Sequence, residues 1–509
     1  MMSSGDPRSL ERVTLAWPLP FARGLSTRRF VLAVCAVVVV LRTVYLVGPF
    51  YSDEAGYTVV ARSLRAGGPN LYGHYFVDRP PGLLLLYRLA TLTGWAPSIR
   101  VLATGLALLL VGSAAWAAYE AVGERGARWA AVVAAALVVT PVLSAQEADG
   151  EILAAPLVML SMALTLAAVR RSGWPALALA TGAGLAAGTA VMVKQNFGDG
   201  VVFALVLLLA SLVQRRTGRR DAAVVAAGGV LGGAVVAAAA LGFVVWSRVG
   251  LRTAWTTVFG FRGTALDVIA DHSLHAPVMR AFDLAGRAVL AGVLPLLVLL
   301  LAEAVRCRFR GPPVAWALGA TALLDVVSIA MGGSYWPHYL LQLVPVLALA
   351  AGLWAADAGR LRAAVAATVA SAVAATVVVT LTGAAYPHDS QRVGAFLARS
   401  SRPGDTATVL YGNAEVQQAS GMRSPYPHLW SLPMRTLDPH LTRLRAVLTG
   451  PRAPTWVVDL GHLDAWHIDA HDRIRLALAT HYRKVAAVCG HTVFLHDGVR
   501  RTLASPRCR

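Results

Sequence analysis

Two kinds of charged side chain lie within residues 51–87, a polar stretch that follows the first long apolar run of the sequence. Adjacent carboxylates, Asp53 and Glu54, open this stretch, and Arg79 lies near its end, just before a Pro-Pro pair. A carboxylate at the end of a membrane-spanning helix is suited to act as a general base at the membrane surface. Acidic groups and a cation on one such loop predict chemistry on a charged substrate that is carried by a lipid. Asp53 and Glu54 are therefore the candidate catalytic residues.

Further polar residues are expected at the same membrane surface, in the connections between apolar segments. A helix-capping role would explain Asp149 or Glu151 equally well. Lys194 could be a lysine whose ammonium group reaches water from a helix end, and His338 could be an interfacial anchor. The residues of this group are Glu147, Asp149, Glu151, Lys194, Tyr335, His338 and Tyr339.

The amino-acid composition is that of a polytopic α-helical membrane protein. Of the 509 residues, 56% are hydrophobic and 14% are charged, and the mean hydropathy is +0.58. A soluble protein of this length could not cover so much apolar surface, and apolar runs of about 20 residues recur along the chain. The net charge of +19 does not indicate nucleic-acid binding, because the basic residues concentrate in short loops, as is typical of the cytoplasmic side of a membrane. The four cysteines have no metal-binding spacing and imply no disulfide framework.

We expect about eleven transmembrane helices in a domain of residues 30–384, after a cytoplasmic segment of residues 1–29. The short loops that contain arginines alternate with loops that contain almost none, which predicts that the N-terminus lies inside. Arg42 and Asp325 fall within expected spans, where we interpret them as structural. The spans are expected near residues 30–48, 101–121, 128–145, 151–169, 176–193, 198–213, 221–246, 287–305, 314–333, 338–356 and 362–384.

Two of the segments outside these spans are long enough to carry function. Residues 49–98 are expected to form an outer catalytic loop, whose end after Pro80 and Pro81 has the character of an interfacial helix. Residues 385–509 are expected to form a small extracytoplasmic α/β domain. Its predicted strands lie at 406–412 and 454–460, and an amphipathic helix at 471–482 precedes a terminal strand pair.

Four motifs in this order resemble the bacterial GT-C glycosyltransferases, closest to the family-39-like set that includes protein O-mannosyltransferases and lipid A aminoarabinose transferases. The resemblance covers residues 28–360. It implies inverting transfer of a sugar from a polyprenyl-phosphate donor to a cell-envelope acceptor, at the outer face of the cytoplasmic membrane. The motifs are Asp53-Glu54, Arg79-Pro80-Pro81, the MVKQ sequence at 192–195 and YWPHYLLQLVPVLALAAG at 335–352.

The same resemblance implies roles for individual residues. Asp53 would deprotonate or orient the acceptor hydroxyl, while Glu54 and Asp149 would position sugar hydroxyls or hold an ion. Arg79 would stabilise the departing polyprenyl phosphate with help from Lys194 and His338. The family usually has Lys-Pro-Pro where this chain has Arg-Pro-Pro. Arginine keeps the positive charge, but the substitution leaves the identity of the sugar donor undetermined. The expected substrate-binding residues are Arg79, Asp149, Glu151, Lys194, Tyr335 and His338.

A lipid-phosphate leaving group needs no cofactor, although the carboxylates could bind a divalent cation. Two alternatives remain at this point. A transporter or flippase of lipid-linked saccharides would need polar groups along a path through the bilayer, and here they gather on one side. A non-catalytic sensor would make the acidic pair and the Arg-Pro-Pro motif accidental.

Overall fold

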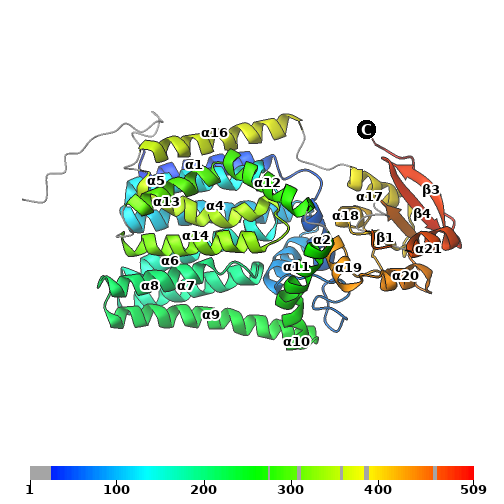
Figure 1. Ribbon diagram of the computed structural model, residues 1–509, viewed down its shortest axis with the longest axis horizontal. Coiled ribbons are helices and arrows are strands. Elements are labelled where there is room, and N and C mark those ends of the chain that lie inside the picture. Colours follow the sequence, from blue (N-terminus) through cyan, green and yellow to red (C-terminus); the bar gives the residue numbers. More distant parts are fainter. Residues whose placement is uncertain are drawn as a thin grey trace, which may run out of the picture.

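The computed structural model describes residues 25–508 except 273–274, 307–310, 356–358, 383–388, 462–466 and 470. The long helices run side by side in one bundle, and a small α/β domain lies at one end of that bundle (Figure 1). A large cavity lies between these two parts and is lined by residues of both.

Seven helices in the described part of the chain are long and apolar enough to cross a membrane. A bent pair of helices would make an eighth span, with an angle of 72° between its halves. Three further helices occupy predicted positions but have only 17, 16 and 15 residues. The polytopic helical fold is therefore confirmed, whereas the predicted count of eleven spans is not.

The seven long helices are α4 (Ser98–Val122), α6 (Gly150–Val169), α7 (Gly173–Val193), α9 (Arg219–Ser247), α14 (Pro313–Met331), the consecutive η4 (Pro337–Leu343) and α15 (Val344–Trp354), and α16 (Gly359–Thr382). The bent pair is α12 (His275–Leu290) and α13 (Val293–Arg306), and the three shorter helices are α1 (Thr27–Thr43), α5 (Glu124–Val139) and α8 (Asp199–Val213).

Small residues allow the helices of the bundle to approach closely. A Cβ atom added to Gly184 of α7 would lie 2.1 Å from the carbonyl oxygen of Gly229 in α9, and one added to Gly232 would lie 2.1 Å from the carbonyl oxygen of Thr181. In a membrane, where lipid tails are as apolar as the side chains, such backbone proximity is a main source of helix association.

Two charged residues inside the bundle, Arg42 and Asp325, form hydrogen bonds with neighbouring groups. Arg42 donates hydrogen bonds of 2.7 Å to the carbonyl oxygens of Val138 and of Ala145. Asp325 accepts a hydrogen bond of 3.3 Å from Gln342. These contacts fit the structural roles expected for both charged residues.

The loop of residues 49–98, which the sequence predicts to lie outside, contains two helices, α2 (Ser52–Arg62) and α3 (Pro81–Thr91). Helix α3 begins directly after Pro80, where proline suits the first helical turn and its missing N–H costs nothing. The helical character predicted for the end of this loop is therefore confirmed. A second segment at the same end of the bundle contains α10 (Leu251–Trp255), a π-helical turn η3 (Thr256–Gly260) and α11 (Phe261–His272).

The C-terminal domain is built on a four-stranded sheet of order β1-β2-β4-β3. β1 and β2 are parallel and the other pairs are antiparallel. The predicted strands, helix and terminal strand pair are all present. The elements are α17 (Asp389–Ser400), β1 (Ala407–Val409), α18 (Ala414–Ser420), α19 (Ser431–Leu437), α20 (Thr442–Thr449), β2 (Trp456–Asp459), α21 (Arg473–His481), β3 (Tyr482–Val488) and β4 (His491–His496).

A disulfide joins Cys489 to Cys508. The expectation that the cysteines form no disulfide framework is wrong for this pair. Cys489 lies in the turn between β3 and β4, and the C-terminal segment folds back along the domain to reach it. The spacing of the cysteines in the sequence does not show that the C-terminal segment packs beside the turn between β3 and β4.

Candidate active site

The first turn of α2 directs its two neighbouring carboxylates to different surroundings. Successive side chains on an α-helix point about 100° apart. The Glu54 carboxylate is fully buried and accepts hydrogen bonds from Arg100 Nε at 2.9 Å and Nη2 at 2.7 Å. It also accepts one from the backbone N–H of Ala148 at 2.9 Å. Glu54 thereby connects α2 to α4 and to the segment before α6. Both of its carboxylate oxygens accept these hydrogen bonds.

Asp53 instead lines a cavity of about 790 Å³ at the end of the bundle. Its carboxylate accepts hydrogen bonds from the indole N–H of Trp430 at 2.8 Å and from the hydroxyl of Tyr57 at 3.1 Å. Burial raises the pKa of Asp53, and the negative charge of Asp149 raises it further, while Arg79, His338 and Tyr57 oppose the rise. A partly buried carboxylate with a raised pKa is suited to accept a proton.

Arg79 and Arg262 form a cationic wall of the same cavity. Both contact Asp78, Arg79 at 2.9 Å and Arg262 at 2.8 Å. Burial alone would raise the pKa of Asp78, but the charges of Arg262 and Arg79 outweigh it and hold that pKa below its usual range. Arg79 Nε also donates to the Tyr57 hydroxyl at 3.0 Å. Tyr57 therefore links the candidate base to the candidate phosphate ligand.

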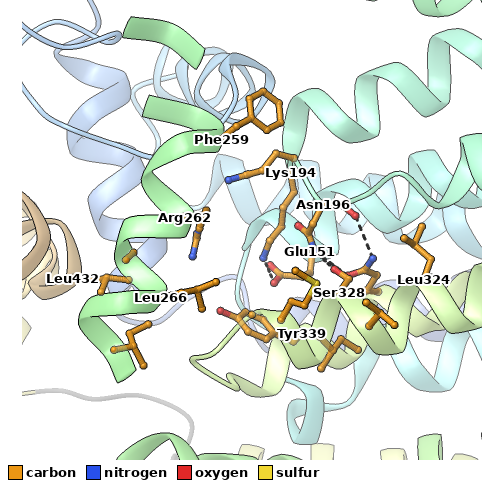
Figure 2. A pocket seen from close by; sticks show the side chains of 18 residues that line it. Glu151, Lys194, Asn196, Phe259, Arg262, Leu266, Leu324, Ser328, Tyr339 and Leu432 are labelled. Atoms are coloured by element: carbon orange, nitrogen blue, oxygen red, sulfur yellow. Dashed lines mark hydrogen bonds and ion pairs between the residues drawn. The ribbon is translucent and has the colours of Figure 1, made fainter. Parts of the chain in front are cut away.

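A second, more apolar cavity of about 400 Å³ adjoins the first, and Arg262 and Tyr339 line both. Figure 2 shows Lys194 directed at Glu151, with Arg262 reaching toward the same space from α11. The Lys194 ammonium also lies 5.1 Å from the centre of the Tyr339 ring. Burial lowers the pKa of Lys194, and the Glu151 carboxylate partly offsets this.

His338 connects the two acidic residues at the start of α6. Its Nδ1 lies 2.9 Å from Asp149 Oδ2, and its Nε2 lies 3.7 Å from Glu151 Oε1. Both Asp149 oxygens are buried and have no well-aligned hydrogen bond in the described part of the chain, although Oδ2 lies close to His338. A metal ion would satisfy these oxygens. Glu147, Asp149 and His338 could each offer it one donor atom, because these atoms lie within 4.8 Å of one another.

Tyr335 does not join this group. It has a left-handed backbone conformation, with φ of 52°. Its hydroxyl donates to the carbonyl oxygen of Ala330 at 3.1 Å, back toward α14. The neighbouring Trp336 and Tyr339 line the cavity in its place. The structure thus brings together Asp53, Arg79, Lys194 and His338 with Asp149 and Glu151, while Glu54 and Tyr335 use their polar atoms elsewhere.

The C-terminal domain supplies part of the cavity wall. Trp430 lies over α2, where a Cβ atom on Gly56 would be 2.1 Å from the indole ring, so only glycine leaves room for it. The outer loop is also bound to this domain, through a hydrogen bond of 3.1 Å from the N–H of Phe76 to the carbonyl oxygen of Pro427 and one of 2.9 Å from the N–H of Ser424 to the Tyr75 hydroxyl. The C-terminal residues that line the cavity are Tyr411, Gly412, Asn413, Glu415, Trp430, Ser431, Leu432, Pro433 and Arg435.

Sequence reasoning missed three residues that position the carboxylates. Tyr57 follows Asp53 by four residues on one helix, a spacing that places both on the same face and could have revealed it. Arg100 is one of many arginines near a helix end, and no local signal sets it apart. Trp430 is 377 residues from Asp53, and nothing near it in the sequence points to their contact.

These features define the class of protein. Membrane helices that carry acidic and basic side chains around a cavity at one end, covered by a small α/β domain, make up the architecture of the GT-C fold. The comparisons agree: the fold is that of the GT-C superfamily of membrane glycosyltransferases, and residues 76–328 match the model of Glycosyltransferase family 87. The resemblance inferred from the sequence motifs is confirmed at this level.

Two solved structures illustrate the similarity. ArnT from Cupriavidus metallidurans, bound to undecaprenyl phosphate, superimposes with a TM-score of 0.60 at 17% identity, over 92% of this chain and 98% of that one. The oligosaccharyltransferase AglB from Archaeoglobus fulgidus, in complex with an inhibitory peptide and a dolichol-phosphate, gives a TM-score of 0.54 at 13% identity, over 89% of this chain and 73% of that one. At such identities the similarity establishes the fold. No curated protein matches the chain in sequence.

Proposed function

We propose that the chain transfers a sugar from a polyprenyl-phosphate donor to a hydroxyl group of a cell-envelope acceptor, with inversion at the anomeric carbon. The observation that carries this proposal is the cavity that Asp53 and Arg79 share, next to a second, largely apolar cavity. A carboxylate that faces cations across one cavity suits a reaction in which a hydroxyl loses a proton and a phosphate departs. The two lipid phosphates bound by the solved relatives support the same donor class.

In the proposed reaction, Asp53 takes the proton of the acceptor hydroxyl as its oxygen attacks the anomeric carbon. The new C–O bond forms on the face opposite the phosphate, and the electron pair of the breaking C–O bond leaves with the phosphate. Arg79, Arg262 and Lys194 stabilise the negative charge of that leaving group. The apolar residues Leu266, Leu324 and Val327 in the adjoining cavity suit the first isoprene units of the donor.

Glu147, Asp149 and His338 would hold a divalent cation, which would add positive charge beside the leaving phosphate. The role of Glu54 is to position α2. Its bonds to Arg100 and Ala148 fix the helix turn that presents Asp53 to the cavity.

We also propose that the N-terminus lies in the cytoplasm and the C-terminal domain outside it. The arginine-rich short loops support this orientation. The Cys489–Cys508 disulfide supports it too, since disulfides persist in oxidising compartments. Labelling of Thr217→Cys and Arg402→Cys with a membrane-impermeant thiol reagent tests it. We expect outside labelling at 402 and not at 217, and the reverse pattern would overturn the orientation.

The activity is tested with purified protein in lipid nanodiscs and a panel of polyprenyl-phosphate sugars. Release of polyprenyl phosphate, together with a glycoside of inverted configuration, is the expected result. A folded protein that releases polyprenyl phosphate from no donor, yet moves a lipid-linked saccharide across vesicle membranes, would be a transporter instead.

A further inference from the structure

The large cavity contains a second group of cations that the proposed reaction does not use. Arg280 of α12 and Arg435 of α19 both line it, together with Asp53 and Arg79. The two groups differ in their partners. Arg79 and Arg262 share the carboxylate of Asp78, whereas no carboxylate of the described residues lies within ion-pair distance of Arg280.

Arg280 is held by an aromatic ring rather than by an acidic residue. Its guanidinium carbon lies 4.9 Å from the centre of the Trp336 ring. Its Nε is buried and has no hydrogen-bond partner in the described part of the chain. Stacking on an indole fixes the plane of a guanidinium and leaves its N–H donors free to face a ligand.

Arg435 adds a second positive charge close to the first. It is buried, with 9% of its surface exposed, and its Nη2 lies 3.5 Å from the carbonyl oxygen of Val268. Burial lowers the pKa of Arg435, and the positive charge of Arg280 lowers it further. Two like charges that lie together in a partly buried cavity repel one another, and a bound anion would relieve that repulsion.

We propose that Arg280 and Arg435 bind an anionic group of the acceptor, either a carboxylate or a phosphate. This inference rests on the proposed function, in which the Arg79 and Arg262 group takes the donor phosphate. A transferase must hold two substrates in one cavity, and two separate cationic groups provide one anion site for each. The acceptor class is therefore an acidic glycan or an anionic glycolipid, whose reacting hydroxyl reaches Asp53 while its anion lies on Arg280.

The test compares three probes that share an octyl glucoside skeleton. Octyl glucoside is neutral, octyl glucuronide carries a carboxylate, and octyl glucoside 6-phosphate carries a phosphate. Their dissociation constants are measured calorimetrically on the full chain in nanodiscs. Hydrogen bonds to a charged group contribute about 1.5–3 kcal/mol, so we expect at least one anionic probe to bind about 10- to 100-fold more tightly than the neutral one. Whichever of the two anionic probes binds more tightly shows whether the acceptor carries a carboxylate or a phosphate.

Arg280→Gln should reduce that preference to about threefold or less, while Arg280→Lys should keep part of it because the charge survives. Arg435→Gln repeats the test at the second position, and Arg452→Gln, at an exposed arginine outside the cavity, is the matched control. Equal or undetectable binding of all three probes by the folded wild type would overturn the proposal, as would a preference that survives in both Arg280→Gln and Arg435→Gln. Failure of the proposed function would be seen in a different measurement: the protein would release no polyprenyl phosphate from any donor, whatever the affinities of the three probes.

Discussion

The indole nitrogen of Trp430 donates a hydrogen bond of 2.8 Å to the carboxylate of Asp53, across 377 residues of sequence. The ring of Trp430 also lies 5.5 Å from that of Tyr57, the other donor to this carboxylate. Asp53 is therefore held by one residue from its own helix and one from the C-terminal domain. The C-terminal domain therefore forms part of the candidate active site.

Replacing Trp430 with phenylalanine keeps an aromatic ring but removes the donor. A hydrogen bond to a charged group contributes about 1.5–3 kcal/mol, so we expect kcat/KM to fall about 10- to 100-fold. The charged form of Asp53 loses stabilisation, which raises the pKa of Asp53 further, and the acid limb of the pH–rate profile moves to higher pH. A pH series of kcat/KM for Trp430→Phe measures both effects. Trp174→Phe, at an exposed tryptophan, is the control, and a Trp430→Phe profile that coincides with the wild type would refute the positioning role.

Arg79 variants test the stabilisation of the leaving group. Arg79→Ala removes a cation from the cavity, and loss of one preorganised donor to a developing oxyanion typically costs about 10²–10³ in kcat. Arg79→Lys should retain part of the activity, because the charge survives although the planar fork is lost. The measurement is single-turnover release of polyprenyl phosphate, with protein abundance monitored in parallel. Wild-type release by Arg79→Ala would show that the phosphate lies elsewhere.

Glu54→Gln should act mainly on folding. The Glu54 and Arg100 side chains are 0% and 1% exposed, and removing one partner of a buried ion pair typically costs about 3–5 kcal/mol. We expect a clear drop in thermal stability in nanodiscs, with the remaining folded fraction still able to turn over. Should Glu54→Gln keep wild-type stability and lose turnover, Glu54 would be a catalytic residue, as the sequence alone suggested.

Removal of divalent cations tests the group formed by Glu147, Asp149 and His338. We expect a chelator to lower transfer reversibly and added Mg²⁺ or Mn²⁺ to restore it, because these ions prefer carboxylate oxygens, which two of the three residues offer. Asp149→Asn should weaken the restoration by raising the cation concentration required. Full transfer in the presence of chelator would mean that the reaction needs no divalent cation at Glu147, Asp149 and His338.

Much of this arrangement could be predicted from the sequence, because the membrane restricts where charged residues can lie. The apolar runs predicted the bundle, and the charges between them predicted Asp53, Arg79, Lys194 and His338 near one another. The sequence could not separate Asp53 from Glu54, since their roles depend on the direction of α2 and on the position of Arg100. It also could not reveal Trp430 or the Cys489–Cys508 pair, because both contacts depend on how the C-terminal domain folds and docks. The count of eleven spans is not confirmed, because α1, α5 and α8 have only 17, 16 and 15 residues, and a span typically needs about 20.

The central claim is that Asp53 is the general base, and turnover by purified, folded Asp53→Asn in nanodiscs tests it most directly. Loss of a general base typically costs 10²–10⁴-fold, so we predict nearly abolished transfer. Binding of polyprenyl phosphate should persist, because Arg79, Arg262 and Lys194 are unchanged. Asp149→Asn, measured in parallel, should retain more turnover. Near-normal transfer by Asp53→Asn, with loss of transfer in Asp149→Asn, would contradict the account and assign the base to the connection before α6.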